Sequence, residues 1–188
     1  MGCWGITAFE SDAGLDAANF IRKNLPEDGK LELGAIIDAL RRDDWNAPSD
    51  ASLAQSHSSP MALAEIITNF MDGNAGGMDY GEEWAAQANK FSAITSFTAS
   101  RESVRWLRDY LCDTLKYAVQ DAENGRKWGG WFEKKDWIGW QEHMATLISR
   151  LDGVLAAEGN TVVLFSAAEQ NAAMEESHAQ GNPGMTMK

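Results

Sequence analysis

The sequence predicts a mainly α protein, folded as a compact bundle of five to six helices. Five segments carry apolar residues at the three- and four-residue spacing of an amphipathic helix, and together they cover more than half of the chain. The chain has 188 residues, of which 44% are hydrophobic, so it suits one domain with a buried core. We therefore expect a single helical domain over 1–165. The polar stretch 166–188 has no sustained apolar stripe and is expected to be a disordered tail.

The first two helices are expected over 12–25 and 31–42. Ser11 or Asp12 suits the N-cap of the first, and the turn-forming residues Pro26-Glu27-Asp28-Gly29 end it. The alternation at Lys30–Leu33 would also suit the start of a strand. The longer apolar stripe favours helix for the whole second segment.

A polar, turn-rich surface loop is expected over 43–58. The next helix begins at Ser59-Pro60, because serine suits the N-cap and proline suits the first helical position, and it runs to Gly73. A loop with four glycines in nine positions follows over 73–81. A short helix over 82–90 comes after it.

The two longest helices are expected at 101–123 and from Asp136 to about Leu155. The first carries apolar residues on two faces, which predicts a central helix covered from both sides. The short connection predicts that the second packs antiparallel to it. Residues 91–98 and 160–165 are candidates for a minor two-stranded β element. The first could equally continue a helix, and the second could be a docking tail.

The first seventeen residues form an unusually structured opening. Gly2 and Gly5 bracket Cys3 and Trp4, and Phe9 follows shortly before the first helix. A large aromatic residue between two glycines is typical of a bent backbone that lets an indole ring fill a gap in the core. We therefore expect Trp4 and Phe9 to anchor this segment to the core.

This opening is similar to a known N-terminal signature. Met1-Gly-x-Trp-Gly, followed by Phe9-Glu10-x-Asp12 and Leu15-Asp16, resembles small bacterial proteins of the DUF4259 type. The resemblance covers about seventeen residues, and it implies a bacterial cytosolic protein encoded near toxin or defence genes. It carries no catalytic chemistry.

The net charge restricts the classes of partner. The formal net charge is −12, from 28 acidic residues against 16 Lys and Arg, which argues against nucleic acid and anionic membranes and suits a basic protein. No apolar run approaches the ~18 residues of a membrane span, and the start lacks the pattern of a signal peptide. Two cysteines cannot build a disulfide framework. We expect a cytoplasmic protein with reduced thiols.

The titratable residues predict neither a catalytic constellation, nor a cofactor, nor a metal site. The three histidines are scattered, and His143 lacks the second histidine, four residues away, of a metalloprotease helix. Glu10, Asp12 and Asp16 form an acidic cluster at the start of a helix. Capping and compensation of the helix dipole explain that cluster more simply than a cation site.

Tryptophan is concentrated just before the last helix, where Trp128 and Trp131 lie among glycines and charged residues. These indoles could pack on the end of the bundle or form the centre of an interface. The predicted function is a non-enzymatic protein-binding protein, such as an immunity or inhibitor-like protein that neutralises a basic bacterial toxin. The alternative is a small enzyme or metal-binding protein that uses Glu10, Asp12, Asp79 or Glu82. The predicted partner-binding residues come from two loops: Asp79, Tyr80, Glu82, Glu83, Trp128, Trp131, Glu133 and Asp136.

Overall fold

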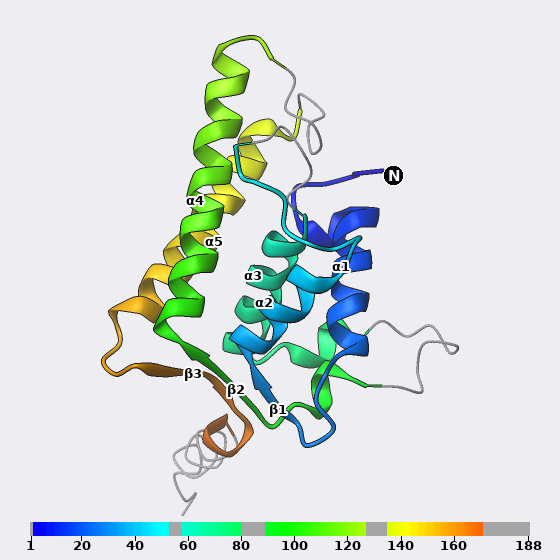
Figure 1. Cartoon of the computed structure of the whole chain (residues 1–188), viewed down its shortest axis with the longest axis vertical. Helices are drawn as coiled ribbons and strands as arrows, with labels where there is room; N and C mark the ends of the chain where they lie inside the picture. The colour runs from blue at the N-terminus through cyan, green and yellow to red at the C-terminus, as the bar shows by residue number, and fades with distance from the viewer. Residues whose placement is uncertain (1, 53–57, 80–88, 127–134, 171–188) are drawn as a thin grey trace, which may run out of the picture.

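The mainly α class with a small β element is confirmed by a computed structural model of the chain (Figure 1). The structure describes residues 2–52, 58–79, 89–126 and 135–170. Three short 3₁₀ turns, η1 to η3, cover Ala8–Glu10, Ala75–Met78 and Phe91–Ala93. The other elements, in chain order, are α1 (Asp12–Lys23), β1 (Lys30–Glu32), α2 (Leu33–Arg42), α3 (Ser58–Met71), β2 (Ser96–Ser100), α4 (Arg101–Glu123), α5 (Trp137–Ala156) and β3 (Thr161–Ser166).

The helices form two groups above a small sheet (Figure 1). The long helices α4 and α5 contact each other along their length and run in opposite directions, as the short connection between them predicts. The shorter helices α1, α2 and α3 stand beside this pair, and α3 contacts α1, α4 and α5. The sheet closes the lower end of both groups in the view of Figure 1.

Within the described residues the sheet has three strands, in the order β1-β2-β3. The expected pairing of two strands is confirmed, since β2 and β3 pair antiparallel with Phe97 opposite Phe165. The register shifts after this pair, so that Thr98 lies opposite Val163 and Leu164 is an extra residue in β3. The strand is shorter than the expected 91–98, because Phe91–Ala93 forms η3 and β2 begins only at Ser96.

The prediction that 31–42 is helical throughout is wrong at its start. Residues Lys30–Glu32 form β1, which pairs parallel to β2 with Leu31 opposite Phe97. Leu31 is buried while its two neighbours are exposed, which is the alternation of a strand with one face on the core. The side chain of Glu32 then accepts a hydrogen bond from the amide of Ala35 at 2.7 Å and caps α2.

The core centres on Phe70 of α3. Its ring contacts those of Phe97 and Phe165 at centroid distances of 5.3 and 5.2 Å, and that of Phe91 at 6.2 Å. Three of these four rings are fully buried. One side chain from α3 therefore contacts β2, β3 and η3, and edge-on aromatic contacts favour this arrangement.

The expectation that Trp4 anchors the N-terminal segment is wrong, because 55% of its surface is exposed. The segment is held by its backbone instead: the amide of Trp4 donates to the carbonyl of Glu10 at 3.0 Å, and that of Asp12 to the carbonyl of Gly2 at 3.1 Å. Ala8 is fully buried, and Phe9 packs against the core as expected.

Because Trp4 is exposed, we expect its truncation to have only a small effect on stability. Trp4→Ala should change the free energy of unfolding by less than about 0.5 kcal/mol, because truncating an exposed side chain removes little buried area. Denaturant unfolding followed by circular dichroism measures this. A loss above about 2 kcal/mol would show that the indole is buried in solution.

Candidate functional site

Of the eight predicted partner-binding residues, the structure describes two. The carboxylate of Asp79 accepts hydrogen bonds from the amides of Phe91 and Ser92, at 2.7 and 3.0 Å, and so joins the end of η2 to the start of η3. Asp136 is the N-cap residue of α5 and is half-buried. The other six lie outside the described residues: Tyr80, Glu82, Glu83, Trp128, Trp131 and Glu133.

Of the acidic residues of the enzyme alternative, Glu82 lies outside the described residues, and the other three bind the backbone. Glu10 Oε2 accepts hydrogen bonds from the amides of Ile6 and Thr7 at 2.9 and 3.0 Å, and from the Thr7 hydroxyl at 3.1 Å. The amide of Thr7 contributes most to lowering the pKa of Glu10 below its usual value. Asp12 Oδ2 accepts from the amide of Gly2 at 2.7 Å. These carboxylates stabilise the fold of the N-terminal segment.

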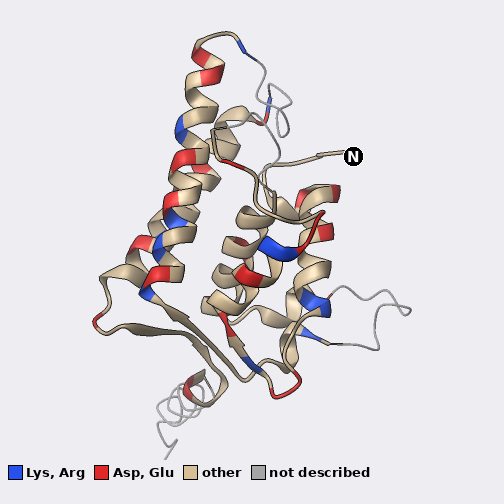
Figure 2. Ribbon diagram, viewed as in Figure 1, with Lys and Arg blue, Asp and Glu red and all other residues tan. Residues whose placement is uncertain are grey.

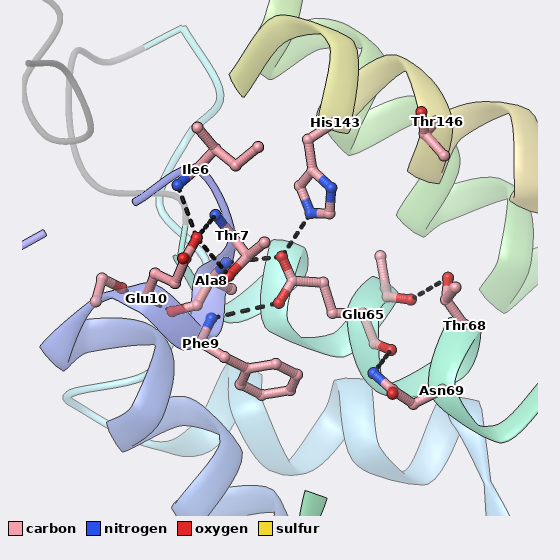
Figure 3. A network of polar contacts seen from close by, with 12 residues as sticks. Ile6, Thr7, Ala8, Phe9, Glu10, Glu65, Thr68, Asn69, His143 and Thr146 are labelled. Carbon is pink, nitrogen blue, oxygen red and sulfur yellow. Dashed lines mark hydrogen bonds and ion pairs between the residues drawn. The ribbon is translucent and has the colours of Figure 1, made fainter. Parts of the chain in front are cut away.

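A buried carboxylate that the sequence analysis did not single out lies beside this segment (Figure 3). Glu65 of α3 is only 4% exposed. Its Oε1 accepts from the amide of Ala8 at 2.7 Å and lies 2.7 Å from His143 Nε2, and its Oε2 accepts from the amide of Phe9 at 3.3 Å. A sequence signal existed, because Glu65 is the one charged residue among the fourteen of α3.

The Glu65–His143 pair has the carboxylate–imidazole form found in many catalytic sites. Here both carboxylate oxygens are occupied, and they join η1 to α3 and α5. Within the part of the chain that the structure describes, no three His, Cys, Asp or Glu side chains gather closely enough to hold a metal ion. The arrangement therefore fits a structural clamp on the N-terminal segment.

An exposed tryptophan follows α2. Trp45 is 71% exposed and lies in the polar loop after residue 42, between Asp44 and Asn46. Asp43 Oδ1 accepts from the amide of Trp45 at 3.1 Å and from that of Asn46 at 2.7 Å. These bonds, led by that from Asn46, lower the pKa of Asp43. Trp45 is thus presented to solvent on an ordered turn.

The same loop is attached to α4 further along. The hydroxyl of Tyr110 donates to the carbonyl of Ser49 at 2.7 Å, and burial raises the pKa of Tyr110 to about 12, so the hydroxyl keeps its proton at neutral pH. The Tyr110 ring lies 5.6 Å from that of Trp106, which in turn lies 4.7 Å from the guanidinium of Arg41 on α2. Helix α2, the loop and α4 therefore share one surface.

We name this the α2–α4 surface. Figure 2 shows acidic positions on α2, on α4 and along the segment that follows α2. The surface holds five acids, namely Asp38, Asp43, Asp44, Asp50 and Glu102, against Arg41 and Arg42. Its aromatic residues are Trp45, Trp106 and Tyr110. A tryptophan exposed among acidic residues is suited to a protein interface.

Comparisons of the chain with protein-family models, with curated proteins and with solved structures find no match. The candidate site therefore rests on its own geometry.

Among the described helices, none combines the length and the apolar character that crossing a bilayer requires.

Proposed function

We propose that this is a non-enzymatic protein-binding protein whose α2–α4 surface recognises a basic protein. The observation that carries the proposal is Trp45, which is 71% exposed on an ordered turn and directly follows Asp43 and Asp44. A large apolar side chain fixed in solvent gains free energy when a partner covers it, and tryptophan is the residue most enriched among interface hot spots.

Charge and aromatic surface have separate roles in the proposed binding. The chain's net charge of −12 attracts a cationic partner over about a Debye length, ~8 Å at physiological salt, and so raises the rate of association. Desolvation of Trp45 slows dissociation, since most affinity differences arise in the dissociation rate. The association and dissociation rates are measured independently, so the role of charge and the role of Trp45 can be tested separately.

The narrower form of the proposal is an immunity or inhibitor-like protein that neutralises a basic bacterial toxin in the cytoplasm. The resemblance of residues 1–17 to DUF4259-type proteins supports this form, as does the acidic charge. The loops 76–84 and 127–136 stay predicted partner-binding loops, and most of their predicted binding residues lie outside the part of the chain that the structure describes. The carboxylates of Glu10, Asp12 and Asp79 bind backbone amides, which favours binding over the enzyme alternative.

The test screens any basic protein encoded beside this chain's gene for binding and measures its kinetics by surface plasmon resonance, with lysozyme as a non-cognate basic protein. Trp45→Ala should speed dissociation of the cognate partner by roughly thirtyfold, the ~2 kcal/mol typical of a hot spot. The double variant Asp44→Asn/Asp50→Asn should slow association, and this effect should fade as salt rises.

The matched control substitutions are placed away from the α2–α4 surface, one on the sheet and one beyond the end of α5. Val163→Ala removes an exposed apolar side chain from β3, and Glu158→Gln removes an exposed charge, so both should leave the kinetics unchanged. Unaltered dissociation of the cognate partner from Trp45→Ala would contradict the assignment of this surface. Turnover of a substrate by the purified chain, with no protein partner, would overturn the proposed function itself.

A further inference from the structure

A cavity of about 230 Å³ opens between α2 and α4 within the α2–α4 surface. The residues that matter to its chemistry are Gly34, Asp38, Arg41, Glu102, Ser103 and Trp106. It therefore combines two carboxylates, one guanidinium, one hydroxyl and the ring of an indole. Ligand pockets for drug-sized molecules run to ~300–1,000 Å³, so this cavity suits a single side chain better.

The absence of a side chain at Gly34 keeps one wall of the cavity close to α4. A Cβ added at this position would lie 2.9 Å from Glu32 Oε2 and 3.1 Å from Ser103 Oγ. Any larger residue would therefore have to displace the carboxylate that caps α2 or the hydroxyl on α4. The backbone of α2 thus forms a close, polar wall opposite Ser103.

The resident Arg41 shows what the cavity binds. Its guanidinium lies 4.7 Å from the centroid of the Trp106 ring, within cation–π distance, and 3.4 Å from Asp38 Oδ1. An aromatic face and a carboxylate are the two groups that a planar guanidinium recognises best. About half of the surface of both Arg41 and Asp38 side chains stays accessible, at 48% and 62%.

The charges in the cavity are unbalanced. Asp38 and Glu102 supply two negative charges, and Arg41 supplies one positive charge. Glu102 is exposed in the first turn of α4 and, among the residues that the structure describes, has no cationic side chain within ion-pair distance. One further cation would make the cavity neutral.

We propose that this cavity receives an arginine side chain of the basic partner. The incoming guanidinium pairs with Glu102 and shares Asp38, while Arg41 stays on the Trp106 ring. Two guanidinium groups then face two carboxylates, which offsets their mutual repulsion. Arginine fits better than lysine, because its planar, weakly hydrated guanidinium binds carboxylates through two parallel hydrogen bonds. The inference rests on the proposed function, since it names the chemistry by which the partner is recognised.

The probe for this cavity is an acetylated tetra-arginine amide, titrated into the full-length ¹⁵N-labelled chain. Its control is the tetra-citrulline peptide, which keeps the shape of the side chains and lacks their charge. We expect the largest shifts at the amides of Gly34 and Ser103, small shifts at Gly153 and Glu158, and none with citrulline. Glu102→Gln should lower the affinity for the arginine peptide by up to about fivefold, which is the upper range for an exposed ion pair. Glu123→Gln, which removes an exposed acid at the far end of α4, should not.

Shifts spread evenly over all acidic positions, or affinity unchanged in Glu102→Gln, would overturn the cavity assignment. So would equal shifts with tetra-citrulline. The result of the peptide titration can be distinguished from the result of the partner-binding test. Faster partner dissociation from Trp45→Ala with no localised peptide shifts would leave the function standing without this cavity. Localised peptide shifts, together with partner kinetics that Trp45→Ala does not change, would support the arginine cavity and contradict the proposed role of Trp45.

Discussion

Glu65→Ala is expected to lower the free energy of unfolding by about 3–5 kcal/mol, the cost of removing one member of a buried polar pair. The carboxylate satisfies the amides of Ala8 and Phe9 and lies 2.7 Å from His143 Nε2. The alanine variant would leave a fully buried amide at Ala8 without its acceptor. Chemical denaturation followed by far-ultraviolet circular dichroism measures the loss.

Two further variants separate the contributions around Glu65. Glu65→Gln keeps an acceptor oxygen for the amides and should cost less than the alanine variant. His143→Ala removes one partner from a position nearer the surface, and a double-mutant cycle with Glu65→Ala gives the coupling between the two side chains. A loss below about 1 kcal/mol for Glu65→Ala would show that the N-terminal segment is not held by this carboxylate.

Gly14→Ala should be at least as damaging as many core truncations, with a loss of more than about 3 kcal/mol. A Cβ at this position would lie 1.8 Å from the carbonyl oxygen of Ala8 and 2.4 Å from its carbonyl carbon. These are backbone atoms, so no side-chain rotation relieves the overlap. Either α1 or η1 must move, and η1 is fixed by the hydrogen bonds to Glu65.

The matched control for Gly14→Ala is Gly153→Ala in α5. Nothing lies within 4 Å of a Cβ added at Gly153, so alanine there should stabilise the helix by about 0.5–1 kcal/mol. Opposite signs for the two substitutions, measured in one denaturation series, are the expected result. Equal effects would mean that the close contact between η1 and α1 does not exist in solution.

The helices were predictable because their signals are local. The prediction for α4 matches the observed Arg101–Glu123, since Ser100 caps its start through the amide of Ser103 and Asn124-Gly125 ends it. Glycine at 125 adopts the left-handed backbone that stops a helix, with φ of 67°. The pairing of β2 with β3 was also predicted, from two apolar segments long enough to recognise.

What could not be predicted depends on partners far away in the sequence. A three-residue strand such as β1 exists only because β2 pairs with it, so the local alternation alone could not outweigh the helical stripe after it. The position of Trp4 was predicted from its glycine neighbours, yet Trp4 is exposed and the nearby Ala8 is fully buried. Size alone does not decide which side chain of a bent segment faces the core.

The candidate site shows the same division. Acidic residues in loops were expected to face a partner, whereas Asp79 accepts hydrogen bonds from residues 91 and 92, a contact that spans twelve positions and leaves no local pattern. Trp45 lies in the predicted loop 43–58, which the structure confirms over residues 43–52. Its importance arises from α4, which brings Tyr110 and Trp106 next to that loop.

The strand order has a consequence for how the chain acquires its structure during synthesis. The central strand β2 pairs on one side with residues 30–32 and on the other with residues 161–166. The sheet therefore cannot be completed until the ribosome has released the segment after α5, although the first three helices emerge much earlier. Such non-local pairings slow folding relative to a simple helical bundle, and the unpaired edge of β2 is exposed to misassociation meanwhile. A chain truncated before residue 161 and released from the ribosome should thus bind chaperones more strongly than a released chain that ends after residue 170.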